Sequence, residues 1–295
     1  MSLVATLISD PLHRAVTPPL ANSVAERLGA SRLDWLAEAV ACDIALPAAT
    51  DAATAREALR AALAGQAVDA VVQPAAGRRK ALLLADMDST MIDQECIDEL
   101  ADAIGIKARV AEITARAMRG EIAFEPALRE RVALLAGLET TVVERVIAER
   151  ITLARGGREL VATMNTAGAF TALVSGGFDV FTGPVAGRLG FREHRANRLI
   201  EEAGRLTGHV AEPILGRAAK AATLDELAAR LGIAAEAVLA VGDGANDLDM
   251  IRMAGAGVAL HAKPAVAEAA PFRIDHGDLT ALLYMQGYRR DEFAA

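Results

Sequence analysis

The sequence is poor in cysteine, in aromatic residues and in long apolar runs. Its two cysteines, Cys42 and Cys96, are too few for a disulfide framework and indicate free thiols in a reducing compartment. Aromatic residues make up only 3%, and acidic residues outnumber basic ones by 39 to 31, which argues against a nucleic-acid-binding surface. No apolar run reaches the roughly 18 residues of a membrane span, and residues 1–14 lack the basic start of a secretory signal. We therefore expect a cytoplasmic protein without membrane or nucleic-acid partners.

Apolar material for a core is nevertheless abundant, with 53% hydrophobic residues in a chain of 295. This length suggests one or two domains. Four short apolar runs stand out between stretches with helical spacing. Such runs predict strands of a parallel sheet covered by helices on both faces, so the expected fold class is α/β with a Rossmann-like sheet. The runs are Ala81–Ala85, Thr171–Val174, Val238–Val241 and Gly257–Leu260.

The chain divides into regions of different character. Residues 1–73 combine short strand and helix patterns, which predicts a small N-terminal α/β domain. Residues 74–80 contain proline, glycine and three consecutive basic residues and are typical of a linker. Residues 94–165 have helical periodicity without a convincing strand. We interpret them as a helical cap inserted into a catalytic core formed by residues 81–93 and 166–295.

Two segments of the predicted core do not follow the strand-and-helix alternation. Phe178–Gly190 contains three glycines and Pro184, which predicts a turn-rich excursion. Ala196–Ala211 alternates weakly and contains two glycines, which favours a hairpin or an extended ribbon.

Carboxylates follow the first apolar run directly, in the order Asp86-Met87-Asp88-Ser89-Thr90. Two carboxylates at positions i and i+2 beyond a buried strand can approach one hard cation such as Mg²⁺, which prefers oxygen ligands. An ordinary surface turn is the alternative for a lone Asp-x-Asp. A calcium-binding EF-hand loop is excluded, because Met91 stands where that loop requires glycine and because a strand precedes the motif.

The ends of two further apolar runs carry small and acidic residues. Ser175-Gly176-Gly177 offers a hydroxyl and free backbone N–H groups suited to phosphate oxygens, although an ordinary turn would look the same. Gly242-Asp243-Gly244-Ala245-Asn246-Asp247 adds two carboxylates, although a helix cap is again an alternative. Lys220 begins a helical stretch, where a lone lysine is usually a solvated charge. Because ligands of open parallel sheets bind beyond the carboxyl ends of the strands, we expect these clusters to converge.

The order of these motifs along the chain resembles that of the haloacid dehalogenase superfamily of phosphotransferases. The resemblance covers about Ala81 to Leu283 and is sharpest to its phosphoserine phosphatase family. The further residues that carry it are Glu95, Met118-Arg119-Gly120, Phe124-Glu125, Leu128-Arg129-Glu130-Arg131 and the stretch from Gly242 to Met250. Residues 1–73 resemble the family only loosely. They look like the small regulatory-type α/β domain that some longer members carry.

The resemblance implies a role for each motif. Asp86 is the implied nucleophile and Asp88 the general acid and base. Mg²⁺ is the implied cofactor, held by Asp86, Asp88 through its backbone carbonyl, and Asp243, with Asp247 supporting it from farther out. The implied phosphate-binding groups are Ser175, the Gly176 N–H and Lys220, and the implied serine-binding residues are Glu95 for the ammonium, Arg131 for the carboxylate, and Asn246.

The activity implied by the resemblance is hydrolysis of O-phospho-L-serine to L-serine and phosphate, the last step of L-serine biosynthesis. The reaction would pass through an aspartyl-phosphate, and the cap would exclude bulk water. A related phosphotransferase that passes phosphate to another alcohol, such as homoserine, is the alternative, because its motifs would be identical. An amino-acid-binding regulator with a silent catalytic half is disfavoured by the intact Asp86, Asp88, Lys220 and Asp243. A homodimer is compatible with the resemblance.

Overall fold

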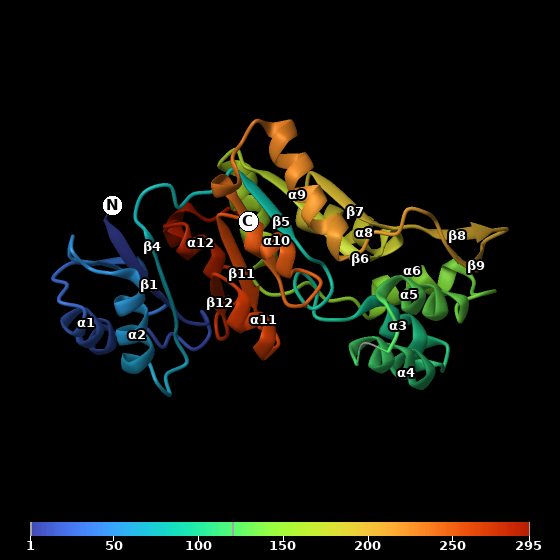
Figure 1. Ribbon diagram of the computed structural model, residues 1–295, viewed down its shortest axis with the longest axis horizontal. Helices are drawn as coiled ribbons and strands as arrows, with labels where there is room; N and C mark the ends of the chain where they lie inside the picture. The colour runs from blue at the N-terminus through green and yellow to red at the C-terminus, as the bar shows by residue number, and fades with distance from the viewer. Residues whose placement is uncertain (1, 120, 295) are drawn as a thin grey trace.

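The computed structural model describes residues 2–119 and 121–294, with Met118 described through its backbone alone. Within these residues the strands form a four-stranded, a six-stranded and a two-stranded sheet. In Figure 1 the four-stranded sheet lies at the left end of the molecule, the six-stranded sheet in the middle and the two-stranded sheet at the right.

The elements, in chain order, are β1 (Leu3–Ile8), α1 (Pro18–Arg27), β2 (Leu33–Ala37), β3 (Ala41–Ala45), α2 (Ala52–Ala62), β4 (Asp69–Pro74), β5 (Leu82–Ala85), α3 (Cys96–Ala103), α4 (Lys107–Met118), α5 (Phe124–Ala133), α6 (Thr140–Glu149), α7 (Gly157–Thr166), β6 (Phe170–Phe178), α8 (Asp179–Leu189), β7 (Glu193–Asn197), β8 (Leu199–Glu202), β9 (Arg205–Val210), α9 (Arg217–Leu231), η1 (Ala235–Ala237), β10 (Val238–Gly242), α10 (Leu248–Met253), β11 (Ala256–Leu260), α11 (Pro264–Ala269), β12 (Phe272–Ile274), α12 (Ala281–Met285) and η2 (Arg290–Glu292).

The N-terminal unit is an antiparallel sheet of order β2-β3-β1-β4 with two helices. Apolar residues of α1 and α2 pack on one face of this sheet and form a core of their own. The other face contributes Ile8, Val40 and Val71 to the main core, where they join Leu282 and Met285 of α12. Burial of apolar area on both faces therefore gives this unit a core of its own and joins it to the main core through the second face.

The central sheet is parallel throughout, with strand order β12-β11-β10-β5-β6-β7. The expected α/β class is therefore confirmed, and β5, β6, β10 and β11 correspond to the four predicted apolar runs. The edge strands β7 and β12 were not predicted. Strand β7 reads Glu-His-Arg-Ala-Asn and β12 has only three residues, so neither shows the continuous apolar run that marks an interior strand.

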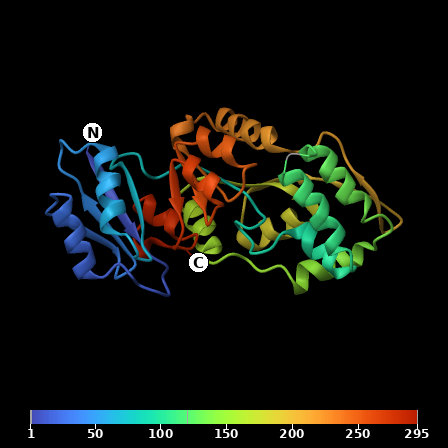
Figure 2. The same cartoon turned by 60° about the horizontal axis from the view of Figure 1, so that its bottom comes forward.

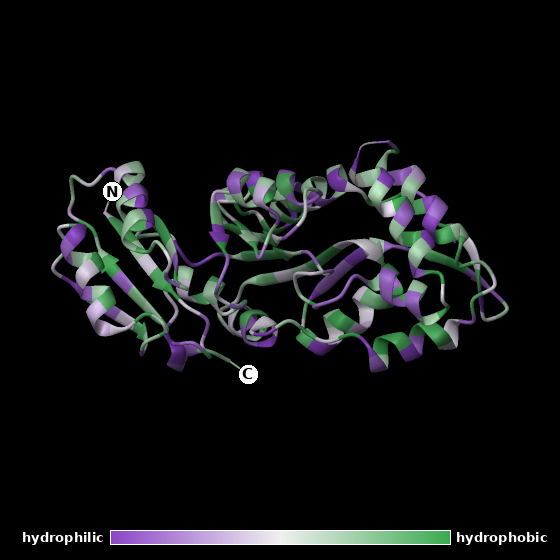
Figure 3. Cartoon of the chain, turned by 90° about the horizontal axis from the view of Figure 1, so that it is seen from below, coloured by the Kyte–Doolittle hydropathy of each residue, from purple (hydrophilic) through white to green (hydrophobic). Residues whose placement is uncertain are grey.

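Alternate residues of the central strands point to opposite faces of the sheet. Leu82 and Leu84 of β5 pack with α9 and α10, whereas Leu83 packs with α7, α8 and α12 on the other face. Figure 3 shows strands coloured mainly as hydrophobic and helices that alternate between hydrophobic and hydrophilic residues, as expected of helices with one buried side. No helix of the described residues is long and apolar enough to span a lipid bilayer.

A group of four helices, α3 to α6, stands apart from the central sheet together with the ribbon β8–β9 (Figure 2). The predicted hairpin at residues 196–211 is confirmed as this ribbon. Although the sequence assigned it to the core, its backbone is tied to the helices: Gly137 N–H donates to the carbonyl of Leu206, and Leu206 N–H donates to Leu138, both at 2.8 Å. Gly208 (φ +82°) permits this contact, since a Cβ there would lie 2.8 Å from Ala136 Cβ.

Two segments differ from their sequence-based interpretation. The turn-rich excursion predicted for residues 178–190 is wrong, because Asp179–Leu189 forms helix α8 despite Pro184. Its Phe181, Val185 and Leu189 are four residues apart and all buried, and this apolar stripe outweighs the poor helix propensity of glycine and proline. Helix α7 falls within residues 94–165 except for its last residue, Thr166, but packs against β6 and α8 of the core.

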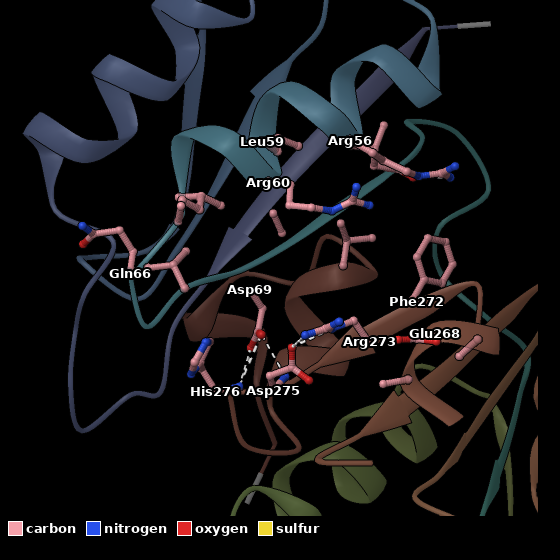
Figure 4. Close-up of a pocket in the computed structure, with 18 of the residues that line it drawn as sticks. Arg56, Leu59, Arg60, Gln66, Asp69, Glu268, Phe272, Arg273, Asp275 and His276 are labelled. Carbon is pink, nitrogen blue, oxygen red and sulfur yellow. Dashed lines mark hydrogen bonds and ion pairs between the residues drawn. The ribbon is translucent and has the colours of Figure 1, made fainter. Parts of the chain in front are cut away.

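The N-terminal unit contacts the central sheet across a groove of about 870 Å³, lined by α2, β4, α11 and β12 (Figure 4). Asp69 of β4 crosses this interface and accepts hydrogen bonds from the backbone N–H groups of Asp275 at 2.8 Å and Gly277 at 2.7 Å. Burial raises the pKa of Asp69, while these N–H groups oppose the rise.

Candidate active site

The predicted motifs meet at the carboxyl end of the central sheet. Strand β5 lies between β6 and β10, so the residues that follow these three strands are neighbours in space. Asp86 follows β5, Ser175 lies near the end of β6, and Asp243 follows β10. Convergence of side chains separated by more than 150 positions was predicted from the parallel topology, and the structure has it.

Lys220 joins two buried carboxylates at the centre of this site. Its Nζ atom lies 2.6 Å from Oδ1 of Asp86 and 2.6 Å from Oδ1 of Asp247, and all three side chains are buried. Burial and the charge of Asp247 raise the pKa of Asp86 well above its usual range, whereas Lys220 lowers it. Burial alone would lower the pKa of Lys220, but the two carboxylates raise it, so the lysine is charged.

Three carboxylates form a group suited to a cation. Oxygen atoms of Asp86, Asp243 and Asp247 lie within 4.8 Å of one another. Burial and the charge of Asp247 raise the pKa of Asp243. Three acidic groups facing one lysine leave excess negative charge, and an all-oxygen donor set fits a hard divalent cation. The group contains Asp247, for which the resemblance implied a more distant role. It does not contain the Asp88 side chain, which the resemblance also keeps away from the cation.

The carboxylate of Asp88 is directed to the other side of the site. Its Oδ1 accepts from the backbone N–H of Cys96 at 2.9 Å, and its Oδ2 accepts from the hydroxyl of Ser175 at 3.1 Å. Ser175 Oγ also accepts from the Gly177 N–H at 2.8 Å. A Cβ at position 177 would lie 2.9 Å from Asp88 Oδ2 and 3.0 Å from Ser175 Oγ, so Gly177 leaves room for both side chains. Asp88 and Ser175 are thereby fixed relative to each other.

The loop after β10 wraps around the carboxylate of Asp247. The Gly244 N–H donates to Asp247 Oδ2 at 3.0 Å. A Cβ at Gly242 would lie 2.4 Å from Asp247, and one at Gly244 would lie 2.2 Å from Asn246 Oδ1. Gly242 therefore leaves room for the Asp247 side chain and Gly244 for the Asn246 side chain, whereas the close approach to a ligand expected of this motif stays a prediction. Asn246 directly precedes Asp247 in this loop.

Glu95 and Arg131 represent the predicted amino-acid-binding pair. Glu95 lies at the start of α3 and accepts from the hydroxyl of Ser89 at 2.8 Å. Desolvation by the surrounding protein is the largest effect and the charge of Asp88 the second, and together they raise the pKa of Glu95 to about 7. Solvent reaches the Glu95 side chain, so screening reduces this effect.

Arg131 projects from α5 of the helical group. Its Nε donates to the carbonyl of Ala127 at 3.3 Å and Nη1 donates to Thr114 Oγ1 at 3.4 Å. Burial lowers its pKa, and the negative charges of Asp98, Glu95 and Asp88 oppose that shift. Within the described residues no carboxylate forms an ion pair with this guanidinium. A half-buried arginine without an ionic partner near acidic residues is suited to a ligand carboxylate.

The structure also brings residues to the site that received no role from the sequence. Thr90 Oγ1 lies 3.4 Å from Asp243 Oδ1. The ring of Phe124 on α5 lies 3.5 Å from where a Cβ of Gly176 would stand. Asn197, in the unpredicted strand β7, contacts the backbone of Gly176. Thr90 and Phe124 lie in motifs that carry the resemblance, whereas Asn197 has no sequence signal. Gly120 of the Met118–Gly120 motif lies outside the described residues.

The cavity of Figure 4 is separate from this site, since none of the predicted site residues lines it. The predicted site residues therefore gather at the carboxyl end of the central sheet, away from the groove beside the N-terminal unit.

Comparisons with known proteins agree with this geometry. The family model described as haloacid dehalogenase-like hydrolase matches residues 83–252. The phosphoserine phosphatase of Streptomyces coelicolor is 40% identical over 99% of this chain and 72% of its own length. A solved HAD family hydrolase from Salmonella enterica serovar Typhi has a TM-score of 0.86 over 96% of this chain and 97% of its own, at 29% identity.

A further solved structure, a phospho-aspartyl intermediate analogue of phosphoserine phosphatase, has a TM-score of 0.65 and 41% identity, covering 70% of this chain and 98% of its own. The similarity therefore extends from sequence motifs to the whole fold, and the resemblance stated from the sequence is confirmed. The chain belongs to the phosphoserine phosphatase family of the haloacid dehalogenase-like hydrolases.

Proposed function

We propose that this chain is a Mg²⁺-dependent phosphatase that hydrolyses O-phospho-L-serine to L-serine and phosphate. The observation that carries the proposal is the placement of Asp86, whose carboxylate contacts Lys220 and belongs to the cation-suited group, with Asp88 directed to the opposite side. A carboxylate nucleophile beside a separate carboxylic acid provides the two groups that a two-step phosphoryl transfer needs.

In the first step the Asp86 carboxylate attacks phosphorus, and the bond from phosphorus to the serine oxygen breaks. That oxygen takes a proton from Asp88. In the second step water attacks the aspartyl-phosphate, Asp88 accepts the proton of the water, and phosphate leaves with Asp86 restored. Lys220, 2.6 Å from the nucleophile, orients Asp86 and favours its ionised form against the opposing effect of burial. A solved relative described as a phospho-aspartyl intermediate analogue supports this route.

The phosphate is held by donors on both sides of Asp86. Ser175 Oγ, the Gly176 N–H and Lys220 Nζ neutralise its oxygens as charge develops. Mg²⁺, held by Asp86, the Asp88 backbone carbonyl and Asp243, with Asp247 nearby, would neutralise the dianion that the nucleophile approaches. The side chain of Asp88 stays free to exchange a proton, because Cys96 N–H and Ser175 hold it away from the carboxylate group.

The serine part of the substrate is recognised from the cap side. Glu95 binds the ammonium group, Arg131 binds the carboxylate through its forked donors, and Asn246 contacts the substrate beside the loop after β10. We assign the cap to α3–α6 with the ribbon β8–β9, and α7 to the core, because of the packing of α7 on β6. The cap excludes bulk water during the reaction.

The test is phosphate release from a panel of phosphomonoesters with and without Mg²⁺, with D86N as the inactive control. The panel contains O-phospho-L-serine, its D-enantiomer, phosphoethanolamine and a sugar phosphate, each with and without added homoserine as an acceptor. We expect hydrolysis of O-phospho-L-serine to exceed that of the others and to require the metal. Equal rates for all esters, or phosphate transferred to homoserine instead of water, would contradict the proposal.

A further inference from the structure

We propose that Asn197 is a positioning residue for catalysis, which fixes the phosphate-binding loop of β6 against the helix that carries Lys220. The proposal rests on the proposed function of Ser175 and Asp88 and extends it to a residue that contacts neither substrate nor metal. The supporting observations are the irregular pairing of β6 with β7, the three hydrogen bonds of the Asn197 carboxamide, and the route by which they reach Asp88.

Strand β6 bulges where it forms the phosphate-binding loop. From Val174 to Phe178 this strand advances four residues, while β7 advances two, from Arg195 to Asn197. A bulge leaves backbone groups without strand partners, and bulges beside active sites serve to redirect side chains. The unpaired segment contains Ser175, so its shape must be fixed by contacts other than the strand ladder.

The buried side chain of Asn197 supplies these contacts. Its Nδ2 donates to the Gly176 carbonyl at 2.8 Å and to the Leu215 carbonyl at 3.1 Å. Its Oδ1 accepts from the Leu215 N–H at 2.6 Å. Leu215 lies directly before Gly216, which begins the helix that carries Lys220. One carboxamide therefore connects the phosphate-binding loop with the start of α9.

The connection continues to the catalytic carboxylate through a single peptide plane. The carbonyl of Gly176 and the N–H of Gly177 belong to the same planar peptide, so fixing one orients the other. The Gly177 N–H donates to Ser175 Oγ, and Ser175 in turn donates to Asp88 Oδ2. Without Asn197 this peptide can rotate, and the positions of Ser175 and Asp88 lose their support.

Asn197 also stands at the base of the ribbon that packs on the cap. The ribbon leaves β7 immediately after Asn197 and returns before Leu215, and the Ala211 N–H donates to the Arg198 carbonyl at 2.8 Å across the same base. The carboxamide is thus placed where the cap connection, the phosphate-binding loop and the Lys220 helix meet.

The test compares N197A and N197D with N165A as a matched control. Asp is similar in shape to Asn and keeps the acceptor for Leu215 N–H, but it lacks the donor to Gly176. Asn165 also makes three hydrogen bonds, to Gly190, Thr171 and Arg192, at the opposite end of β6. The measurements are kcat and KM for O-phosphoserine, inhibition by orthovanadate and by L-serine, and thermal unfolding.

For both Asn197 variants we expect kcat to fall about 10- to 100-fold, the scale of a misplacement of about 1 Å at a reacting centre. Vanadate inhibition should weaken by about tenfold, while L-serine inhibition, which depends on Glu95 and Arg131, should change less than about threefold. N165A should keep kcat within about twofold of the parent even if its melting temperature falls equally.

The proposal is overturned if N197D keeps the parental kcat, if N165A loses as much activity as the Asn197 variants, or if vanadate and serine inhibition weaken equally. Failure of both Asn197 variants to fold would also overturn it, since Asn197 would then be a structural residue. The proposed function is tested separately by the parent enzyme. If the parent hydrolyses a different phosphomonoester, the same comparison on that ester still tests Asn197.

Discussion

Lys220 Nζ lies 2.6 Å from Oδ1 of Asp86, and the same ammonium group lies 2.6 Å from Oδ1 of Asp247. One lysine thus holds two buried carboxylates together before any metal binds. A buried carboxylate without a partner would take up a proton and lose its nucleophilicity. Lys220 therefore stabilises the ionised carboxylates of the resting enzyme, in addition to its proposed contact with the phosphate.

Replacing Lys220 should reduce both turnover and stability. K220M removes the only cation that pairs with Asp86 within the described residues, and removing one partner of a buried ion pair costs about 3–5 kcal/mol. We expect the free energy of unfolding to fall on this scale without metal and to recover partly in Mg²⁺. The control is K80M, since Lys80 Nζ donates to the backbone carbonyls of Gly77 and Glu236 and forms no ion pair within the described residues. Chemical denaturation of both variants checks this, and equal losses would contradict it.

Arg131 should determine the preference for a substrate carboxylate. R131A truncates one partner of a hydrogen-bonded charge pair, which costs about 2–5 kcal/mol. The expected loss of kcat/KM for O-phosphoserine is therefore about 30-fold or more. Phosphoethanolamine lacks the carboxylate, so its kcat/KM should change little.

Arg129, two residues earlier, provides the control for this comparison, because it is exposed and pairs with Glu125 and Glu212. R129A should leave kcat/KM nearly unchanged for both substrates, since surface ion pairs contribute little to stability. An equal loss for both substrates in R131A would mean that this arginine holds the cap or the phosphate instead of the carboxylate.

Glu95 should give the enzyme an acidic limb in its pH profile. Only the ionised carboxylate attracts the substrate ammonium, and the pKa of Glu95 is raised from 4.5 to about 7. Because a raised pKa means that the charged form is lost as the pH falls, kcat/KM should decline below about pH 7. Screening by solvent moves the midpoint toward 4.5.

The substrate phosphate also titrates, with a pKa near 6, so the pH profile of the parent enzyme reflects the ionisation of both the phosphate and Glu95. E95Q removes the enzyme group and keeps the substrate group. We expect the difference between the two pH profiles to report the ionisation of Glu95. E95Q should also lower kcat/KM for phosphoserine and for phosphoethanolamine alike. A pH profile of E95Q with the same shape as that of the parent would show that Glu95 does not titrate in this range.

Much of this site was predictable because its residues follow apolar strands in a recognisable order. Asp86, Ser175 and Asp243 were placed at one sheet edge from topology alone. Composition could not distinguish Arg131 from Arg129, and only the resemblance selected it. Strand β7 was missed because an edge strand needs no apolar run, and Asn197 was missed with it.

The errors in the fold have a common cause. Helix α8 was misread because tertiary packing of Phe181 and Val185 overrode the local signals of glycine and Pro184. The ribbon was assigned to the core because sequence proximity does not reveal that β9 packs on α5. Local patterns therefore do not show which distant segment a helix or strand packs on.

Calcium should bind in place of magnesium and inhibit. It takes six to eight oxygen ligands at about 2.3–2.6 Å, whereas Mg²⁺ takes six at about 2.0–2.1 Å. The larger ion can engage both oxygens of Asp86 and thus occupy the attacking lone pair. Initial rates at fixed Mg²⁺ with increasing Ca²⁺ should fall and should recover with excess Mg²⁺. Equal turnover with either ion would refute this explanation.

The central claim is that Asp86 becomes phosphorylated during turnover. The most direct measurement is acid quenching of the enzyme with O-phosphoserine in the steady state, followed by borohydride reduction and peptide mass spectrometry. Reduction converts an aspartyl-phosphate to homoserine, so the account predicts that change at position 86 alone and its absence in D86N. Turnover without any modified aspartate, or modification at Asp88 or Asp243 instead, would contradict the assignment of Asp86 as the nucleophile.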